Sequence, residues 1–173
     1  MADRTLALGI VGLGNAGGAL AAALAPQCQL FGFDIDPARR AAVGGLDITL
    51  TTSPTGVAEN AIAAILSLPH PDISLAVADR LLAIIDPPEL IIETGTITPK
   101  TAQALAAKCA ARGVLFVDAA IAGGVQSMAA GQCTFLVGGD DAAVARARPI
   151  LDLVAADIHH LGPVGAGSGA KIV

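Results

Sequence analysis

Aromatic residues are nearly absent from this chain: its 173 residues include no Trp, no Tyr and only four Phe. Hydrophobic residues nevertheless make up 54% of the sequence, so the core has to be built mainly from Ala, Leu, Ile and Val. Such side chains suit helices that pack closely on a buried sheet. At this length the chain fits one ordinary domain, which buries roughly two-thirds of the surface of its unfolded form.

Positive charge is also scarce, with ten Lys and Arg against fifteen Asp and Glu and a formal net charge of −5. These cations are scattered along the chain rather than grouped. Binding to nucleic-acid phosphates requires clustered Lys and Arg. We therefore expect no nucleic-acid partner.

Cysteine is limited to Cys28, Cys109 and Cys133, which lie far apart and form no CxxC pair. An odd number of widely spaced cysteines is typical of free thiols in a reducing compartment rather than of a disulfide framework. We expect buried thiols and a cytoplasmic location. His, Cys and acidic residues show no metal-ligand spacing either, so we expect no bound metal.

The sequence has no long hydrophobic run free of helix-weakening residues. Its most apolar stretch, "GIVGLGNAGGALAAALA" at residues 9–25, contains five glycines and Asn15. Glycine lowers helix stability by about 1 kcal/mol relative to alanine, and a membrane span needs ~20 mainly apolar residues. We therefore expect no membrane partner. A secretion signal is the alternative, because Arg4 precedes the run and small residues follow at 23–25.

Short apolar runs alternate along the chain with segments of helical periodicity. We expect strands at residues 6–11, 29–33, 48–51, 61–68, 90–93, 114–119 and 133–137. We expect helices at residues 16–25, 37–43, 53–60, 73–85, 99–112 and 140–155. Apolar strands alternating with helices indicate parallel βαβ units whose sheet is covered on both faces. The predicted fold is α/β: a Rossmann-like, doubly wound, mostly parallel sheet with helices on both faces.

The pattern G-x-G-x-x-G follows the first predicted strand and opens the first predicted helix. Its residues are Gly12, Leu13, Gly14, Asn15, Ala16 and Gly17. The first glycine permits a tight turn, the second lets the backbone approach a pyrophosphate, and the third lets helix and strand pack closely. The helix N-terminus adds free N–H groups and a partial positive charge. The pattern predicts a dinucleotide-binding loop.

An acidic residue ends the second predicted strand at the distance that such a loop requires. Asp34 lies 22 residues after the first glycine of the loop, and the fingerprint expects an acid near ~20. We expect Asp34 and Ile35 to contact the adenosine ribose and Asp36 to cap the next helix. The alternative is that both acids only cap or solvate the turn.

The same carboxylate bears on the choice of dinucleotide. It accepts hydrogen bonds from ribose hydroxyls but repels a 2′-phosphate, by ~1 kcal/mol at 4 Å in water and by ~4 kcal/mol at an intermediate dielectric. We expect the cofactor to be NAD, with NADP less favoured. Arg39 and Arg40, in the following helix, would soften this preference.

Five stretches together resemble the β-hydroxyacid dehydrogenase family, the group of 3-hydroxyisobutyrate dehydrogenase and tartronate semialdehyde reductase. They are "GLGNAG", "SLPHP", "ETGTITP", "DAAIAGGVQSMAAGQCT" and "GPVGAGSGAK". The resemblance covers essentially the whole chain, as the nucleotide-binding domain of that family. It implies that Leu68, Pro69 and Thr96 lie near the cofactor and that Lys171 is the catalytic acid/base.

The resemblance also implies that the substrate is contacted at positions 95 and 122–124. Gly95 and Ala122 stand where the family has serine, whereas Gly123 and Gly124 match it. The two lost hydroxyls would have held a substrate carboxylate, and the backbone N–H groups of the two glycines can still bind one. These departures leave the identity of the substrate open.

The function implied is an NAD-dependent oxidoreductase that oxidises the CH–OH group of a 3-hydroxy acid or reduces the corresponding semialdehyde. Residues 1–162 are expected to form the NAD-binding domain, and residues 163–173 to begin an interdomain helix. Family members bind substrate against a C-terminal helical domain that this sequence does not include, and homo-oligomers are expected only with it. The alternative is a nucleotide-binding module without catalysis of its own. Imine reductases, which generally lack the lysine, are a weaker alternative.

Overall fold

The computed structural model describes residues 5–173. Residues 1–4, which include Arg4 and the first residues of the predicted 1–162 domain, lie outside the described part. The strands within it are β1 (Ala7–Val11), β2 (Gln29–Phe33), β3 (Ile48–Leu50), β4 (Ala63–Leu66), β5 (Leu90–Glu93), β6 (Leu115–Ala122), β7 (Cys133–Gly138) and β8 (Ala155–Gly162). The helices are α1 (Asn15–Leu24), α2 (Pro37–Ala42), α3 (Pro54–Asn60), α4 (Pro71–Leu82), α5 (Pro99–Ala110), α6 (Val125–Ala129), α7 (Asp141–Leu151) and α8 (Ala166–Ile172).

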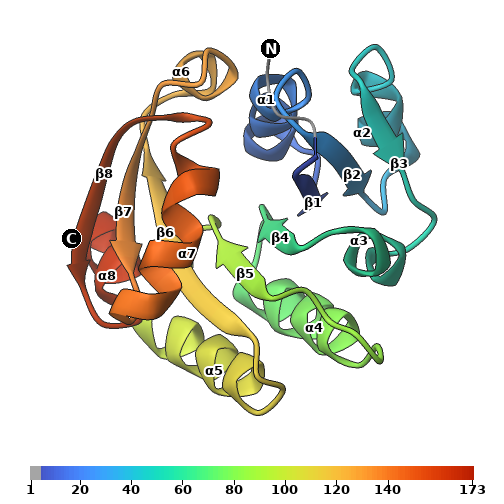
Figure 1. The fold of residues 1–173 in the computed structure, drawn as a ribbon. Coiled ribbons are helices and arrows are strands. Elements are labelled where there is room, and N and C mark those ends of the chain that lie inside the picture. Colours follow the sequence, from blue (N-terminus) through green and yellow to red (C-terminus); the bar gives the residue numbers. More distant parts are fainter. Residues whose placement is uncertain (1–4) are drawn as a thin grey trace.

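The described strands form one eight-stranded sheet in the order β3-β2-β1-β4-β5-β6-β7-β8. The strands from β3 to β6 are parallel to one another, β7 is antiparallel to β6, and β8 is parallel to β7. Figure 1 shows helices on both sides of this twisted sheet. The predicted mostly parallel α/β fold is confirmed.

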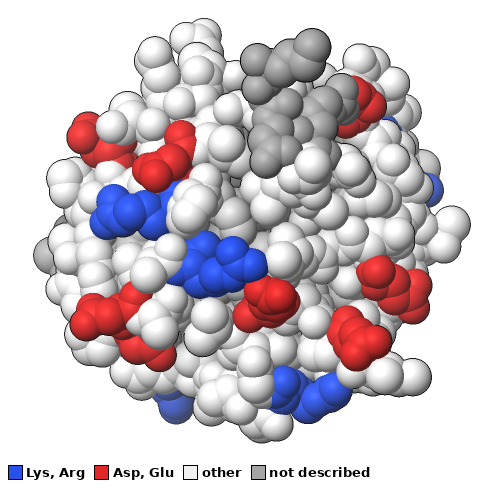
Figure 2. Space-filling view, in the orientation of Figure 1, with Lys and Arg blue, Asp and Glu red and all other residues white. Residues whose placement is uncertain are grey.

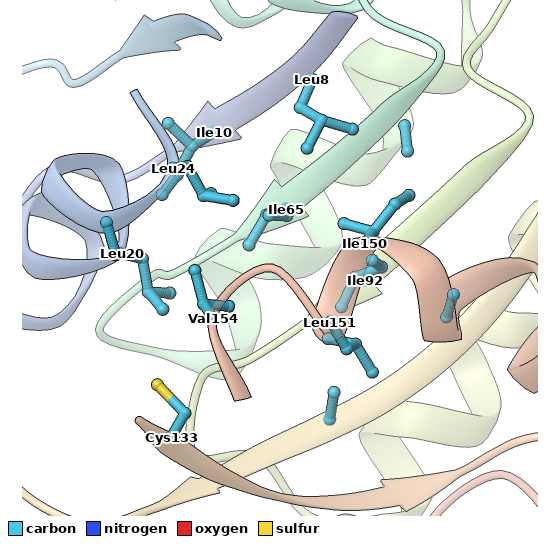
Figure 3. Close-up of a cluster of buried hydrophobic side chains, with 14 of the residues drawn as sticks. Leu8, Ile10, Leu20, Leu24, Ile65, Ile92, Cys133, Ile150, Leu151 and Val154 are labelled. Atoms are coloured by element: carbon cyan, nitrogen blue, oxygen red, sulfur yellow. The ribbon is translucent and has the colours of Figure 1, made fainter. Parts of the chain in front are cut away.

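Each face of the sheet carries its own hydrophobic cluster, because successive side chains of a strand point to opposite faces. In β4, Ala63 and Ile65 belong to the cluster under α1 and α7, whereas Ala64 and Leu66 belong to the cluster under α3, α4 and α5. Figure 3 shows side chains from α1, α7 and the strands lying together in the first cluster. A strand buried on both sides is apolar at every position, which explains the continuous runs in the sequence.

Polar side chains begin four of the helices. Asp36, Ser53, Thr98 and Asp140 each accept a hydrogen bond from a backbone N–H of the first turn, at α2, α3, α5 and α7 respectively. Such N-caps replace hydrogen bonds that the first turn of a helix lacks. The predicted capping role of Asp36 is confirmed.

The predicted helix at 140–155 is wrong at its C-terminal end. Helix α7 ends at Leu151, two residues after Pro149, and residues from 155 onward form β8 instead. Proline supplies no N–H for the helical ladder. The carbonyl of Val154 accepts a hydrogen bond from the first residue of β7 at 2.8 Å, so pairing with β7 decides the structure that follows.

Helix α6 and the full length of β6 were not predicted. The predicted strand stopped at residue 119, but β6 continues to Ala122 because its last residues pair with the antiparallel β7. The five residues of α6 then join these two strands. A helix this short spans little more than one turn and leaves no periodic pattern in the sequence.

The charged side chains lie on the surface in small mixed groups. On the face shown in Figure 2, Lys and Arg lie close to Asp and Glu. Two exposed pairs, Lys108–Asp79 and Arg146–Glu89, each have a nitrogen–oxygen distance of 2.7 Å. Within residues 5–173, every helix is too short or too polar to cross a bilayer.

Candidate functional site

The glycine loop joins β1 to α1 at the carboxyl end of the sheet. Gly12 has a φ of +99°, and a Cβ there would overlap the carbonyl oxygen of Ser67. A Cβ on Gly17 would overlap the carbonyl oxygen of Gly12. Both positions therefore accept only glycine, the first for its conformation and the close approach of β4, the second for the packing of helix on turn.

The N-terminus of α1 offers hydrogen-bond donors beside this loop. Gly14 is the N-cap residue, and no described side chain caps the helix. The first N–H groups of a helix have no partner inside it, and they carry partial positive charge. Together with the glycine turn, they form a concave backbone surface that fits a diphosphate.

Asp34, at the end of β2, is only 5% exposed. Its Oδ2 accepts a hydrogen bond of 2.8 Å from the N–H of Leu13, and its Oδ1 accepts one of 2.8 Å from the N–H of Asp36. The carboxylate thus ties the glycine loop to the end of β2. Each oxygen has a further lone pair, with which it can accept a hydrogen bond from a ribose hydroxyl.

Two cavities of about 300 Å³ each meet along this edge of the sheet. The first runs from the N-terminus of α1 to Lys171, and the second lies beside Asp34 and Ile35. Arg39, Ser67, Leu68 and Pro69 line both of them. The cavities therefore form the two halves of one groove. It crosses the sheet where the chain order reverses, between β2 on one side of β1 and β4 on the other, which is where open α/β sheets bind their ligands.

Lys171 reaches the first cavity from α8. Its Nζ donates a hydrogen bond of 2.8 Å to the carbonyl oxygen of Ile121, near the end of β6. The buried Asp118 holds the start of α8: Oδ1 accepts from the N–H of Gly165 at 2.8 Å, and Oδ2 accepts from the N–H and the hydroxyl of Ser168 at 2.7 and 2.8 Å. Asp118 is thus a positioning residue for the helix that carries the lysine.

A second buried carboxyl supports the turn at the far wall of that cavity. Glu93, only 1% exposed, accepts a hydrogen bond of 2.6 Å from the N–H of Gly95 through Oε1. Burial, reinforced by the neighbouring carboxylate of Asp118, raises the pKa of Glu93 from 4.5 to about 7. A Cβ on Gly95 would lie 2.7 Å from Oε1 of Glu93 and 2.9 Å from the carbonyl oxygen of Leu68. Glycine at position 95 therefore matches glutamate at position 93.

Most of the residues predicted from the sequence meet in the groove. They are Gly12, Gly14, Asn15, Ala16, Gly17, Asp34, Ile35, Leu68, Pro69, Gly95, Thr96 and Lys171. Leu13 is buried beneath the loop, and only its backbone contacts Asp34. Ala122, Gly123 and Gly124 are exposed and lie just past Ile121, outside the lining of both cavities.

Sequence reasoning missed four lining residues. Ile121 and Met128 line the first cavity, and Arg39 and Ser67 line both. Ser67 stands directly before the Leu–Pro pair, and its neighbours could have indicated it. Ile121 and Met128 carry no chemical signal, since apolar residues of a strand and a short helix read as core.

Residues 7–162 match the family described as the NAD binding domain of 6-phosphogluconate dehydrogenase. The chain belongs to this family of NAD-binding domains. NAD is thus its cofactor, in agreement with the glycine turn and the uncapped helix. The resemblance to the β-hydroxyacid dehydrogenases is confirmed, because the relatives described next are dehydrogenases of that group.

The 3-hydroxyisobutyrate dehydrogenase of Pseudomonas aeruginosa is 36% identical over 171 residues, covering 95% of this chain and 57% of that protein. The NAD-dependent L-serine dehydrogenase of the same organism is 44% identical over 94 residues, which are 54% of this chain and 32% of that protein. The structure of Mycobacterium tuberculosis 3-hydroxyisobutyrate dehydrogenase with L-serine has a TM-score of 0.92 and 32% identity, covering 96% of this chain and 58% of that one. The chain spans about half the length of the relatives that it matches over nearly all of its own.

Proposed function

We propose that this NAD-binding domain serves an oxidoreductase that oxidises the CH–OH group of a 3-hydroxy acid, or reduces the corresponding semialdehyde. One observation carries the proposal: Lys171 lines the same cavity as the N-terminus of α1 and the Gly95–Thr96 turn. The bound cofactor supplies or accepts the hydride. The chain itself supplies the surface that orients the cofactor and the group that handles the proton.

Lys171 is proposed as the acid/base. As an ammonium it stabilises and protonates the alkoxide oxygen that forms when an aldehyde is reduced, and as a neutral amine it takes the proton of the hydroxyl in the reverse direction. Its hydrogen bond to the carbonyl of Ile121 fixes the direction of Nζ and leaves further N–H groups to point at the substrate.

The substrate class follows from the relatives and from the segment after Ile121. L-Serine and 3-hydroxyisobutyrate, which name those relatives, both carry a hydroxyl on the third carbon of a carboxylic acid. The backbone N–H groups of Gly123 and Gly124 are proposed to bind the carboxylate. They begin two residues past the carbonyl that Lys171 contacts, so the carboxylate and the hydroxyl can be held together.

The test is Lys171→Ala in the natural full-length protein. Turnover of 3-hydroxy acids should fall by about a hundredfold or more, the usual contribution of a positioned acid or base, while NADH should bind within about threefold of the wild type. Lys100→Ala, an exposed lysine of α5 that lines neither cavity, is the control and should change neither quantity. Wild-type protein that binds NADH without turning over any 3-hydroxy acid or semialdehyde would support the non-catalytic binding module instead.

We also propose a cytoplasmic location. Cys28, Cys109 and Cys133 are free and buried, which suits a reducing compartment. Labelling of the folded protein with a thiol reagent should be slow and should become complete on unfolding.

A further inference from the structure

Arg39 occupies the boundary between the two halves of the groove. It lies on α2 and lines both cavities. Its Nη1 is 3.3 Å from the position that a Cβ of Gly14 would take, so its guanidinium lies over the start of α1. A positive side chain therefore faces the path of any dinucleotide that follows the groove.

The guanidinium of Arg39 is close to carboxylates without being held by them. Its Nη1 is 3.8 Å from Oδ2 of Asp34, and its Nε is 4.0 Å from Oδ2 of Asp36. It makes no hydrogen bond to any other described residue, and its side chain is 50% exposed. Its N–H donors are therefore free for a ligand.

The neighbouring Arg40 has a different environment. Its Nη1 donates to the carbonyl oxygens of Asp34 and Ile35 at 2.6 and 3.2 Å, and it lines neither cavity. Arg40 thus secures the turn after β2, whereas Arg39 is available to the cofactor. Two arginines that are adjacent in sequence have separate tasks.

The charges that line the second cavity are Asp34, Arg39 and Arg80. A carboxylate at the end of β2 bonds the hydroxyls of the adenosine ribose, and a nearby arginine accommodates a 2′-phosphate. Since Arg39 lies within 4 Å of that carboxylate, a phosphate on the 2′ position would lie within reach of its guanidinium. Its charge opposes the repulsion that Asp34 exerts on the phosphate.

We propose that Arg39 is a specificity-determining residue, which binds the 2′-phosphate of NADPH and so limits how strongly the site prefers NADH. The inference rests on the assignment of the groove as the dinucleotide site. NADH lacks the 2′-phosphate and gains little from the arginine. Removing Arg39 should therefore widen the difference between the two cofactors rather than weaken both.

The experiment measures the dissociation constants of NADH and NADPH by the fluorescence of the reduced nicotinamide. For Arg39→Ala, we expect the constant for NADPH to rise about tenfold or more, as removal of a charge about 4 Å from a phosphate predicts, and that for NADH to change by less than about threefold. Arg39→Lys keeps the charge and should retain most of the NADPH affinity. Arg148→Ala, on α7 and outside both cavities, removes the same charge and should alter neither constant.

Other results would overturn the inference in distinguishable ways. An equal loss of affinity for both nucleotides would place Arg39 at a part that they share, such as the diphosphate. Unchanged affinities would give it no role in binding. Failure of the wild type to bind either nucleotide would reject the groove itself as the cofactor site. Circular dichroism and thermal melting of each variant verify that it is folded.

Discussion

Glu93 is a buried acid in the wall of the cofactor groove. One of its oxygens holds the N–H of Gly95, and the other, like the nearby hydroxyl of Ser74, makes no hydrogen bond within the described chain. On the next strand, Asp118 lies directly beside it. Leaving a charge in this setting is costly, which is why the protonated form is favoured up to about pH 7.

This environment predicts how stability depends on pH. The pKa of Glu93 is raised in the folded state, so its contribution to stability is complete below about 4.5 and is lost as the pH rises to about 7. Glu93→Gln cannot ionise, and its amide can donate to Ser74. The free energy of unfolding of the variant should therefore gain on that of the wild type by roughly 3 kcal/mol between pH 4.5 and pH 8.

Urea denaturation across that range measures the difference. Glu59→Gln, at an exposed position of α3, is the matched control and should follow the wild-type curve. Parallel curves for Glu93→Gln and the wild type would mean that Glu93 titrates in the folded protein as it does in the unfolded chain.

At the scale of single residues, the sequence indicated positions better than tasks. The spacing from the glycine loop located Asp34 correctly, but its hydrogen bonds to Leu13 and Asp36 depend on how β2 and the loop meet in space. Glu93 stood in a motif without any sign that it is buried. Nothing in two adjacent arginines tells which of them faces the groove.

Helix α8 depends on a single buried carboxylate for its position. Asp118 lies level with the carboxyl ends of β5, β7 and β8, because Gly138 pairs with Asp118 on one side and with Gly162 on the other. The antiparallel β7 and its neighbour β8 therefore end beside the groove rather than at the opposite edge. The chain can enter α8 there and bring Lys171 to Ile121.

Asp118→Asn tests this positioning role. An amide presents N–H groups where the carboxylate accepts three hydrogen bonds, so the start of α8 should loosen at a cost of about 1–3 kcal/mol. We expect kcat to fall about tenfold or more, with NADH affinity unchanged within about threefold, and hydrogen exchange to accelerate over residues 165–172. Asp141→Asn, in the exposed first turn of α7, is the control. Normal exchange in α8 of the Asp118 variant would contradict the assigned role.

At the scale of elements, continuous apolar runs predicted the buried strands because both of their faces are covered. The reversal between β6 and β7 could not be predicted, since a Gly-rich segment of this length permits either direction. The end of α7 was misplaced because residues 152–155 carry no strong terminator, and tertiary pairing with β7 decides their structure.

For the whole molecule, cofactor binding should act on the stability of the entire chain. The groove joins β1, β2, β4 and β5 with α1, α2, α4 and α8, so unfolding of the chain destroys the site. A ligand at a hundred times its dissociation constant stabilises the folded state by about 2.7 kcal/mol. For a chain of this size, that corresponds to a rise in melting temperature of about 5–10 °C.

Differential scanning fluorimetry with an extrinsic dye, with and without NADH, measures this rise. Gly12→Ala is the control, because a Cβ would overlap the carbonyl of Ser67. The variant should melt lower and should show little response to NADH. Equal responses in both proteins would mean that the glycine turn takes no part in binding.

The shared boundary of the two cavities has a consequence for inhibitor design. A small fragment seated beside Asp34 and another seated beside Lys171 would be separated only by Arg39, Ser67, Leu68 and Pro69. A short linker across these residues would give the second fragment a millimolar effective concentration once the first has bound. Two weak fragments, joined at this point, would thus combine into a tight competitor of the coenzyme.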